Sequence, residues 1–257
     1  TASPGHLLTG GEDGRLALFR VKDWECLHVL RHKYPISGIA VHPSGKVAIT
    51  VGKGRSLRLW NLMTGKQALK GRAPCEPLSV SFSPGTGKYY AILGEQSIAV
   101  FATEGSGDDE DKPVVVAKSK TRLAVMTWLG QDTEDEMAQG SLQLLVAGEG
   151  TIIQNVHLPG DAAPGELGPF LECPKDLMGP RIKGLAIVDD VASADGLAGK
   201  RLQAERRSES PGSHILIAAS SSGMIAGWHL SAHGQEERNG KRSKTVIGES
   251  QSGSSLS

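Results

Sequence analysis

Few residues in this chain of 257 have the types and spacing that chemistry requires. The segment Gly85-Thr86-Gly87-Lys88 resembles the end of a phosphate-binding loop. It lacks the first glycine at the distance that the phosphate-loop motif requires, however, and Tyr89 rather than Ser or Thr follows the lysine. A tight turn between two strands is a sufficient explanation of these glycines. We therefore expect no nucleotide site here and no bound cofactor elsewhere.

The histidines and the acidic runs give no stronger signal. His42 stands before a proline in a turn, which favours a turn hydrogen bond over a role as general base. His229 follows Trp228 at a strand end, which favours packing. The runs 108–111 and 132–136 lack the glycine and carboxylate spacing of a calcium loop and are expected to be solvated. We predict no catalytic residue, no metal site and no enzymatic activity.

Composition narrows the class of protein. The 28 basic and 28 acidic residues cancel, which argues against a protein that binds nucleic acid over its whole surface. Cys26, Cys75 and Cys173 are single and widely spaced, so we expect reduced, buried thiols in an intracellular compartment. The sequence has no apolar run approaching the length of a membrane span, and its amino terminus does not resemble a secretion signal.

Three short β-type runs follow one another between Ile36 and Lys66, and turn residues close each of them. Proline ends a strand because it lacks a donor for the ladder, and glycine permits the positive φ of tight turns. Hairpins of this kind cannot bury their own faces, so they need copies to stack against. The runs are Ile39–Val41, Val47–Val51 and Leu57–Leu62.

Copies of this unit recur along the chain. Phe19, Trp60 and Phe101 stand 41 residues apart, each at the end of an alternating run. Four-strand units that repeat about every 40–45 residues are typical of β-propeller blades. The sequence therefore predicts an all-β propeller with about five blades. The same interval relates the turn prolines Pro43 and Pro84 and the strand residues Thr9, Thr50 and Ala91.

The predicted organisation is one propeller over residues 1–233 and a polar, mostly disordered tail over 234–257, with Thr245–Ile247 its candidate strand. The first blade is expected to lack its innermost strand and the last blade its fourth. Because a propeller must close to remove its sheet edges, we expect about two amino-terminal blades to be absent. Insertions are expected at 105–112, 131–136 and 189–213. The predicted blades are approximately 1–31, 32–71, 72–118, 119–174 and 175–233.

A basic face is predicted from the order of the strands. In a propeller, the connections from the fourth strand of one blade to the first of the next all leave on one face. Here they carry ten basic residues against Glu76 and Asp176, while the acidic insertions project from the opposite face. Two explanations fit this pattern. The basic face binds RNA phosphates or an acidic protein segment, or it reflects only that Lys and Arg are common in exposed loops. The candidate face comprises Arg31, Lys33, Tyr34, Lys70, Arg72, Lys118, Lys120, Arg122, Lys175, Arg181 and Lys183.

The blades resemble WD repeats, although no third strand ends in Trp-Asp. The closing dipeptides are Phe19-Arg20, Trp60-Asn61, Phe101-Ala102, Val156-His157 and Trp228-His229. The segment from His6 to Lys66 closely resembles the PAK-interacting WD-repeat family. The features that carry this resemblance are Glu12-Asp13-Gly14, Asp23–Leu27, His42–Lys46, Leu57-Arg58 and Trp60–Leu62.

This resemblance implies a seven-bladed WD40 β-propeller that acts as a non-catalytic scaffold. Fungal members of the family are assembly factors of the large ribosomal subunit. The implied role is therefore ribosome biogenesis in the nucleolus and nucleus, in pre-60S assembly and pre-rRNA processing. Implied partners are assembly factors and ribosomal proteins, with pre-rRNA backbone contact left open. No membrane or small-molecule substrate is implied. The animal side of the family implies an alternative, a signalling adaptor that binds and restrains a PAK-type kinase.

Overall fold

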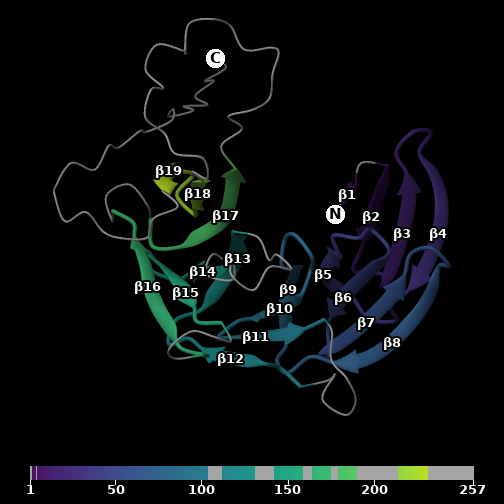
Figure 1. Ribbon diagram of the computed structural model, residues 1–257, viewed down its shortest axis with the longest axis horizontal. Coiled ribbons are helices and arrows are strands. Elements are labelled where there is room, and N and C mark those ends of the chain that lie inside the picture. The colour runs from purple at the N-terminus through teal and green to yellow at the C-terminus, as the bar shows by residue number, and fades with distance from the viewer. Residues whose placement is uncertain are drawn as a thin grey trace, which may run out of the picture.

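The computed structural model describes residues 2–3, 5–103, 112–130, 142–158, 164–174, 179–189 and 214–230. Within these ranges the strands form five antiparallel sheets, each built from strands that are consecutive in sequence (Figure 1). Sheet 1 contains β1 (Ala2–Ser3), β2 (His6–Gly10), β3 (Arg15–Arg20) and β4 (Glu25–Arg31). Sheet 2 contains β5 (Ile36–Val41), β6 (Val47–Gly52), β7 (Ser56–Asn61) and β8 (Lys66–Arg72).

The remaining sheets repeat this order of strands. Sheet 3 contains β9 (Pro77–Phe82), β10 (Tyr89–Gly94), β11 (Ser97–Ala102) and β12 (Val115–Lys118). Sheet 4 contains β13 (Leu123–Leu129), β14 (Gln143–Gly148), β15 (Ile152–Val156) and β16 (Leu167–Glu172). Sheet 5 contains β17 (Ile182–Asp189), β18 (His214–Ser220) and β19 (Ile225–Leu230). The predicted all-β fold of repeated units is confirmed.

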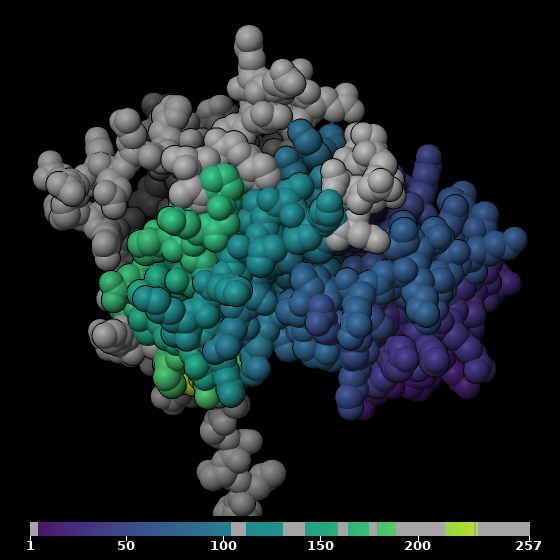
Figure 2. Space-filling model, turned by 90° about the horizontal axis from the view of Figure 1, so that it is seen from below, coloured from purple at the N-terminus to yellow at the C-terminus, as the bar shows by residue number. Residues whose placement is uncertain are grey.

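The core lies between consecutive sheets, which follow one another along an arc (Figure 1). In the space-filling view the colours run from purple to green without interleaving, as this order requires (Figure 2). Side chains alternate between the two faces of each sheet. On β6, Ala48 packs with residues of sheet 1, whereas Ile49 packs with residues of sheet 3. Both faces of a central sheet are therefore buried, and each apolar cluster joins two neighbours.

The innermost position of sheet 1 is occupied, contrary to the prediction that its strand is missing. The short strand β1 pairs with β2, with Ala2 opposite Leu7 and Ser3 opposite His6. A strand of two residues is too short to show an alternating pattern, which explains why the sequence did not reveal it. The predicted acidic insertions, the insertion after Asp189 and the tail with Thr245–Ile247 lie outside the described residues.

The repeat interval changes by one residue in the second strand of sheet 3. In sheet 2, Thr50 pairs with Arg58. Ala99 is the residue of sheet 3 that corresponds to Arg58, and it pairs with Ile92. The prediction that Ala91 corresponds to Thr50 is therefore wrong. The reason lies in the turns, since residues 53–55 join β6 to β7 whereas only residues 95–96 join β10 to β11.

A glycine at the end of the second strand lets the incoming connection cross over it. A Cβ atom on Gly52 would lie 2.1 Å from the carbonyl oxygen of Pro35. On Gly148 it would lie 2.0 Å from that of Arg122. These carbonyls accept hydrogen bonds from the next residues along, Lys53 N at 3.0 Å and Glu149 N at 2.8 Å. Each connection is thereby fixed to the turn of the following sheet.

Candidate interaction surfaces

The connections between sheets and the turns after each second strand form one face, which we call the upper face. His32 N donates to Gly14 O at 2.8 Å, joining the connection after sheet 1 to the β2–β3 turn. Ala73 N donates to Arg55 O at 2.8 Å in the same way one sheet later. The two kinds of loop therefore lie together, and their side chains contribute to the same electrostatic surface.

The predicted basic residues lie on or beside the upper face. Lys33 has a φ of 81°, and its Nζ lies 5.5 Å from the centroid of the Tyr34 ring, within range of a cation–π contact. Lys175 lies outside the described residues, so its position is not assigned. The other candidates are all exposed, namely Arg31, Lys33, Tyr34, Lys70, Arg72, Lys118, Lys120, Arg122, Arg181 and Lys183.

Carboxylates from the turns lie among these cations. Arg122 Nε lies 3.4 Å from Glu95 Oε1, and an Arg181 terminal nitrogen lies 3.1 Å from Glu149 Oε1. Both pairs are exposed, so each adds little stability, but each carboxylate reduces the local positive potential. The prediction counted only the connections and missed these turns. The repeating order of strands was the signal that could have placed Glu95 and Glu149 on this face.

Two groups of cations without such a partner lie on the upper face. One is next to the connection after sheet 1, at Arg31 and Lys33. The other is next to the connection after sheet 3, at Lys118 and Lys120. In the described ranges no ion pair holds these four side chains. They remain the strongest candidates for contact with a polyanion.

The interface between sheets 1 and 2 contains buried polar groups. Trp60 Nε1 donates to Thr50 Oγ1 at 2.8 Å. His32 is fully buried, with Nδ1 3.1 Å from Tyr34 O. Burial lowers the pKa of His32; the hydrogen bond to Tyr34 opposes this shift and the nearby Arg58 charge adds to it. We interpret this imidazole as a neutral structural group beneath the loop that carries Lys33 and Tyr34.

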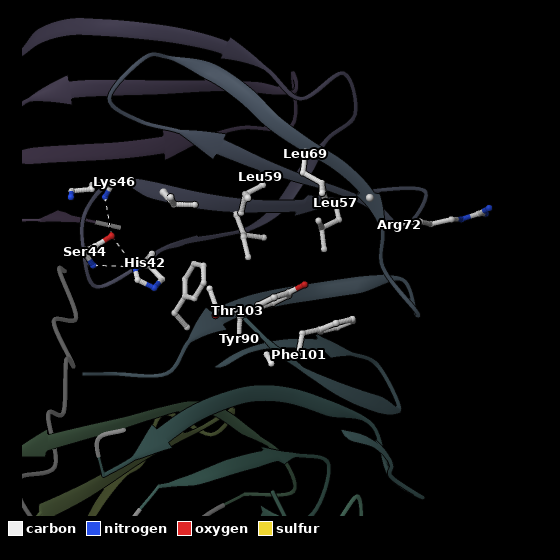
Figure 3. A pocket seen from close by; sticks show the side chains of 15 residues that line it. His42, Ser44, Lys46, Leu57, Leu59, Leu69, Arg72, Tyr90, Phe101 and Thr103 are labelled. Carbon is white, nitrogen blue, oxygen red and sulfur yellow. Dashed lines mark hydrogen bonds between the residues drawn. The ribbon is translucent and has the colours of Figure 1, made fainter. Parts of the chain in front are cut away.

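A groove of about 440 Å³ separates the outer parts of sheets 2 and 3 (Figure 3). Sheet 2 contributes an aliphatic wall and sheet 3 an aromatic one. Tyr90 and Phe101 stack with centroids 4.9 Å apart and planes 5° apart, and Phe82 lies 5.9 Å from Tyr90. Motif searching could not find this groove, because it contains no chemical motif. The residues that define it are Leu57, Leu59, Leu69, Gly71, Phe82, Tyr90 and Phe101.

A missing side chain explains part of this groove. In sheet 1, Leu30 pairs with Leu16 and is buried against sheet 2. In sheet 2 the corresponding partner of Leu57 is Gly71, which has no side chain to extend toward sheet 3. Comparing the two outer strands, ECLHVLR and KQALKGR, shows the change from leucine to glycine in the sequence itself.

The segment that resembled a phosphate loop is a turn, as predicted. Residues 83–88 connect β9 to β10, and Gly87 has a φ of 76°. His42 is a turn hydrogen-bond partner, also as predicted, since its Nδ1 accepts from Ser44 N at 3.1 Å. In the part of the chain that the structure describes, no three His, Cys, Asp or Glu residues are grouped to hold a metal ion. The acidic runs 108–111 and 132–136 and the His229 side chain lie outside the described set.

The three cysteines are free thiols in different environments. Cys173 is buried, and its burial raises the pKa of the thiol to about 11. Cys75 is half-buried, whereas Cys26 is exposed on β4, so the prediction of a buried thiol is wrong for Cys26. Its strand is the outer one of sheet 1, which explains the exposure. Among the described residues, no helix is long and apolar enough to cross a membrane.

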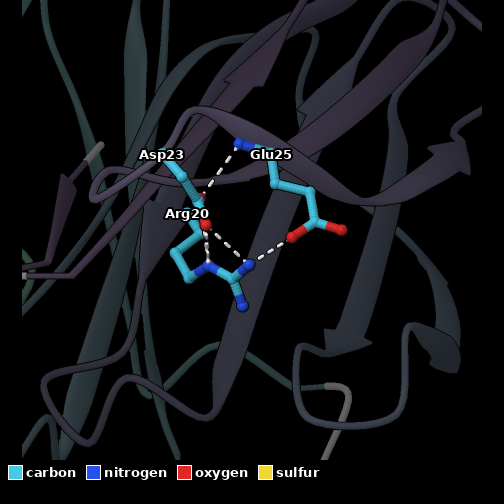
Figure 4. A network of polar contacts seen from close by, with 3 residues as sticks. All are labelled: Arg20, Asp23 and Glu25. Atoms are coloured by element: carbon cyan, nitrogen blue, oxygen red, sulfur yellow. Dashed lines mark hydrogen bonds and ion pairs between the residues drawn. The ribbon is translucent and has the colours of Figure 1, made fainter.

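A second exposed feature lies on the β3–β4 turn, at the end of the sheet opposite the upper face. Arg20 Nε donates to both carboxylate oxygens of Asp23 at 3.0 Å, and Arg20 also pairs with Glu25 (Figure 4). The hydrogen bond from Arg20 lowers the pKa of Asp23. Between these residues Trp24 has a φ of 57° and a relative exposure of 63%. The network therefore holds a turn that presents a tryptophan to solvent.

Comparison with known proteins finds one WD repeat and several similar proteins. Residues 24–61 match the family model described as WD domain, G-beta repeat. A p21-activated protein kinase-interacting protein 1-like chain from Danio rerio is 39% identical over 92 residues, covering 35% of this chain and 25% of the relative. Residues 24–61 of this chain therefore form a WD repeat. The propeller fold predicted from its repeats is confirmed.

Two fungal proteins are also similar to parts of this chain. Shk1 kinase-binding protein 15 from Schizosaccharomyces pombe is 45% identical over 64 residues, covering 24% of this chain and 18% of the relative. Protein MAK11 from Saccharomyces cerevisiae is 31% identical over 125 residues, covering 47% and 30%. The chain thus spans roughly a quarter of the curated relatives it matches.

The fold has a counterpart among solved structures. The solved structure described as the structure of U3-55K superposes with a TM-score of 0.60, covering 87% of this chain and 57% of that chain. The two sequences are 11% identical, so the likeness concerns the fold alone.

Proposed function

We propose that this protein is a non-catalytic scaffold in large ribosomal subunit assembly and pre-rRNA maturation, acting in the nucleolus. The observation that carries the proposal is the match to the PAK-interacting relatives and to Protein MAK11. The implied partners are ribosome assembly factors and ribosomal proteins of the precursor particle. The propeller would extend over residues 1–233 as part of a larger closed ring.

The arrangement of the described residues suits a scaffold. Consecutive sheets share buried apolar clusters, so loops on different sheets keep fixed relative positions. The upper face and the Trp24 turn lie at opposite ends of the sheets, and the groove between sheets 2 and 3 reaches the upper face at Arg72. Different partners can therefore contact different parts of the surface. A rigid body with several contact surfaces can hold partners together without performing a reaction.

The upper face is the proposed contact for pre-rRNA phosphates. Binding of precursor particles should depend on salt, because each phosphate contact releases counterions. Replacing Arg31, Lys33 and Lys120 together by alanine should weaken binding and flatten the plot of log affinity against log salt. The matched control removes the same charge from the opposite face, by alanine at Lys22, Lys66 and Lys88, none of which lines the groove between sheets 2 and 3. An unchanged slope in the first variant would refute phosphate contact at this face.

The experiment that tests the role is sucrose-gradient sedimentation of the tagged full-length protein from cell extract, with mass spectrometry of the fractions. We expect co-sedimentation with large-subunit precursors and assembly factors. A light peak without precursor components would contradict the proposed role.

A signalling role is the second candidate. The names of two relatives, p21-activated protein kinase-interacting protein 1-like and Shk1 kinase-binding protein 15, refer to kinase binding. An adaptor that restrains a PAK-type kinase should bind the kinase in a purified two-protein mixture and appear in light gradient fractions with it. Co-purification with precursor particles, and no binding to the purified kinase, would favour the assembly role instead.

A further inference from the structure

We propose that the groove between sheets 2 and 3 is a docking site for a short, extended peptide of a partner protein. Its occupant would carry large apolar side chains flanked by Asp or Glu. The inference rests on the lining and the ends of the groove. It does not depend on whether the protein works in ribosome assembly or in signalling.

The walls of the groove determine the apolar part of the ligand. Leu57, Leu59 and Leu69 line it from sheet 2, and the Tyr90 and Phe101 rings line it from sheet 3 (Figure 3). Leu69 has a relative exposure of 36%, so the aliphatic wall is open to solvent. Burial of apolar surface against such walls favours binding by about 25 cal/mol per Å². The volume of about 440 Å³ is sufficient for a few side chains rather than a folded domain.

The groove is preformed. Its wall residues belong to β7, β8, β9, β10 and β11, which are held by antiparallel pairing within sheets 2 and 3. The opening exists partly because Gly71 occupies a position where sheet 1 has a leucine. A ligand would therefore meet fixed walls, and little of its binding energy would be needed to order the protein.

The ends of the groove determine the charge of the ligand. His42 and Lys46 stand at one end and Arg72 at the other, with the apolar walls between them (Figure 3). The described lining includes no Asp or Glu. Among the described residues, no ion pair holds the side chain of Lys46 or Arg72. Acidic residues on both sides of an apolar centre would therefore find complementary charge.

An apolar peptide suits this lining better than a nucleic acid base. Single-strand binding sites use aromatic side chains on which successive bases can stack. Here Tyr90 and Phe101 already stack on each other, and the wall opposite is aliphatic. Leucine and phenylalanine side chains can pack against both walls without a hydrogen-bond partner.

The test is fluorescence anisotropy of the full chain with labelled ten-residue peptides. The probes carry a central pair of Leu or Phe residues with Asp or Glu on both sides. One control set replaces the flanking acids by Lys, and another replaces the central pair by Ala. We expect saturable binding of the acidic apolar set, and at least about tenfold weaker binding of both controls, a difference of about 1.4 kcal/mol.

Substitutions locate the site. Leu69→Glu should weaken binding at least about tenfold, because it places a carboxylate on the apolar wall beside an acidic ligand. Arg72→Glu should weaken it several-fold and reduce its salt dependence. The control is Val29→Glu, an exposed apolar residue on the outer strand of sheet 1 that lies outside the groove lining. Leu69 is partly exposed on an outer strand, so the fold should persist, and thermal melting checks this.

Several results would overturn the proposal. These are no binding by any acidic apolar peptide, equal binding of the Lys-flanked set, or wild-type affinity in folded Leu69→Glu. Displacement of the peptide by a single-stranded RNA oligonucleotide, with loss of RNA binding in Leu69→Glu, would assign the groove to RNA instead. None of these results depends on the sedimentation experiment, so the proposed function and this docking site can fail separately.

Discussion

Sheet 2 makes an interface with each of its two neighbours. Both interfaces are built from the same repeat, but one is filled by side chains and the other leaves a groove. Against sheet 1, Leu30 fills the outer part of the interface and Trp60 donates to Thr50. Against sheet 3, the position that corresponds to Leu30 is Gly71, and a groove remains. One position in the outer strand therefore helps decide whether a blade interface is closed core or accessible surface.

The polar groups differ as well. Phe101 takes the place of Trp60, and Ile92 takes the place of Thr50, so the hydrogen-bonded pair becomes an apolar pair. A buried indole N–H needs an acceptor, whereas a phenylalanine does not. The two exchanges occur together, so no indole N–H is left without an acceptor at these two positions. The interface with sheet 1 thus depends on specific partners, and the interface with sheet 3 depends on apolar packing around an opening.

Opening the closed interface should give the largest effect. Leu30→Ala removes buried apolar atoms between sheets 1 and 2 and should lower the free energy of unfolding by about 3 kcal/mol. Leu69→Ala, on the open wall of the groove, should cost less than about 1 kcal/mol because the leucine is already partly exposed. Urea denaturation of both variants measures the difference. Equal losses would contradict the distinction between a closed and an open interface.

Adding a methyl group tests the connection between sheets 1 and 2. Gly52→Ala should destabilise the protein by about 2 kcal/mol, because its Cβ would meet the Pro35 carbonyl and backbone must move. The control is Gly71→Ala, whose Cβ would meet only leucine side-chain ends at 3.3 and 3.5 Å. Chemical denaturation should show little change in that control. If Gly52→Ala were equally mild, the crossing of the connection over β6 would not be a tight contact.

The buried hydrogen bond can be isolated by a double-mutant cycle. Trp60→Phe leaves Thr50 without its donor, and Thr50→Val leaves the indole without its acceptor. The double variant imitates the apolar pair of sheet 3 and should be about 1 kcal/mol more stable than the sum of the single losses predicts. Unfolding free energies of the four proteins measure this coupling. Strict additivity would mean that the bond contributes nothing specific.

Acid should weaken the closed interface through His32. Its pKa is lowered in the folded protein, so below about 6.5 the unfolded chain binds more protons than the folded one. The stabilisation associated with the neutral imidazole is therefore complete above that pH and decreases as pH falls toward the lower folded pKa. His32→Gln should show a smaller loss of stability between pH 7.5 and pH 5.5 than the wild type. An identical loss would exclude His32 as the cause.

The strands could be predicted from sequence because their signals are local. The turn at His42–Gly45 and the aromatic residues Trp60 and Phe101 mark strand ends by residue type and spacing, and the structure places strands between them. The two-residue β1 and the changed interval at Ile92 escaped prediction. They depend on a very short strand and on the length of one turn, which alternation does not reveal.

The surfaces were less predictable, since they depend on contacts between segments far apart in sequence. The basic residues of the connections could be found, but the pairing of Arg122 with Glu95 requires knowing which turn lies beside which connection. The groove exists partly because Gly71 has no side chain to extend toward sheet 3, which follows later in the chain. No sequence motif marks a groove that results from a missing side chain.

The most direct test of the contrast between the two interfaces is the Gly71→Leu variant, which gives sheet 2 the residue that closes the interface in sheet 1. Its affinity for the acidic apolar peptide and its melting temperature would be measured together. We predict an unchanged or higher melting temperature and at least about tenfold weaker peptide binding, because the new side chain occupies the groove. A folded Gly71→Leu protein that binds the peptide as tightly as the wild type would contradict the assignment of this groove as a docking site.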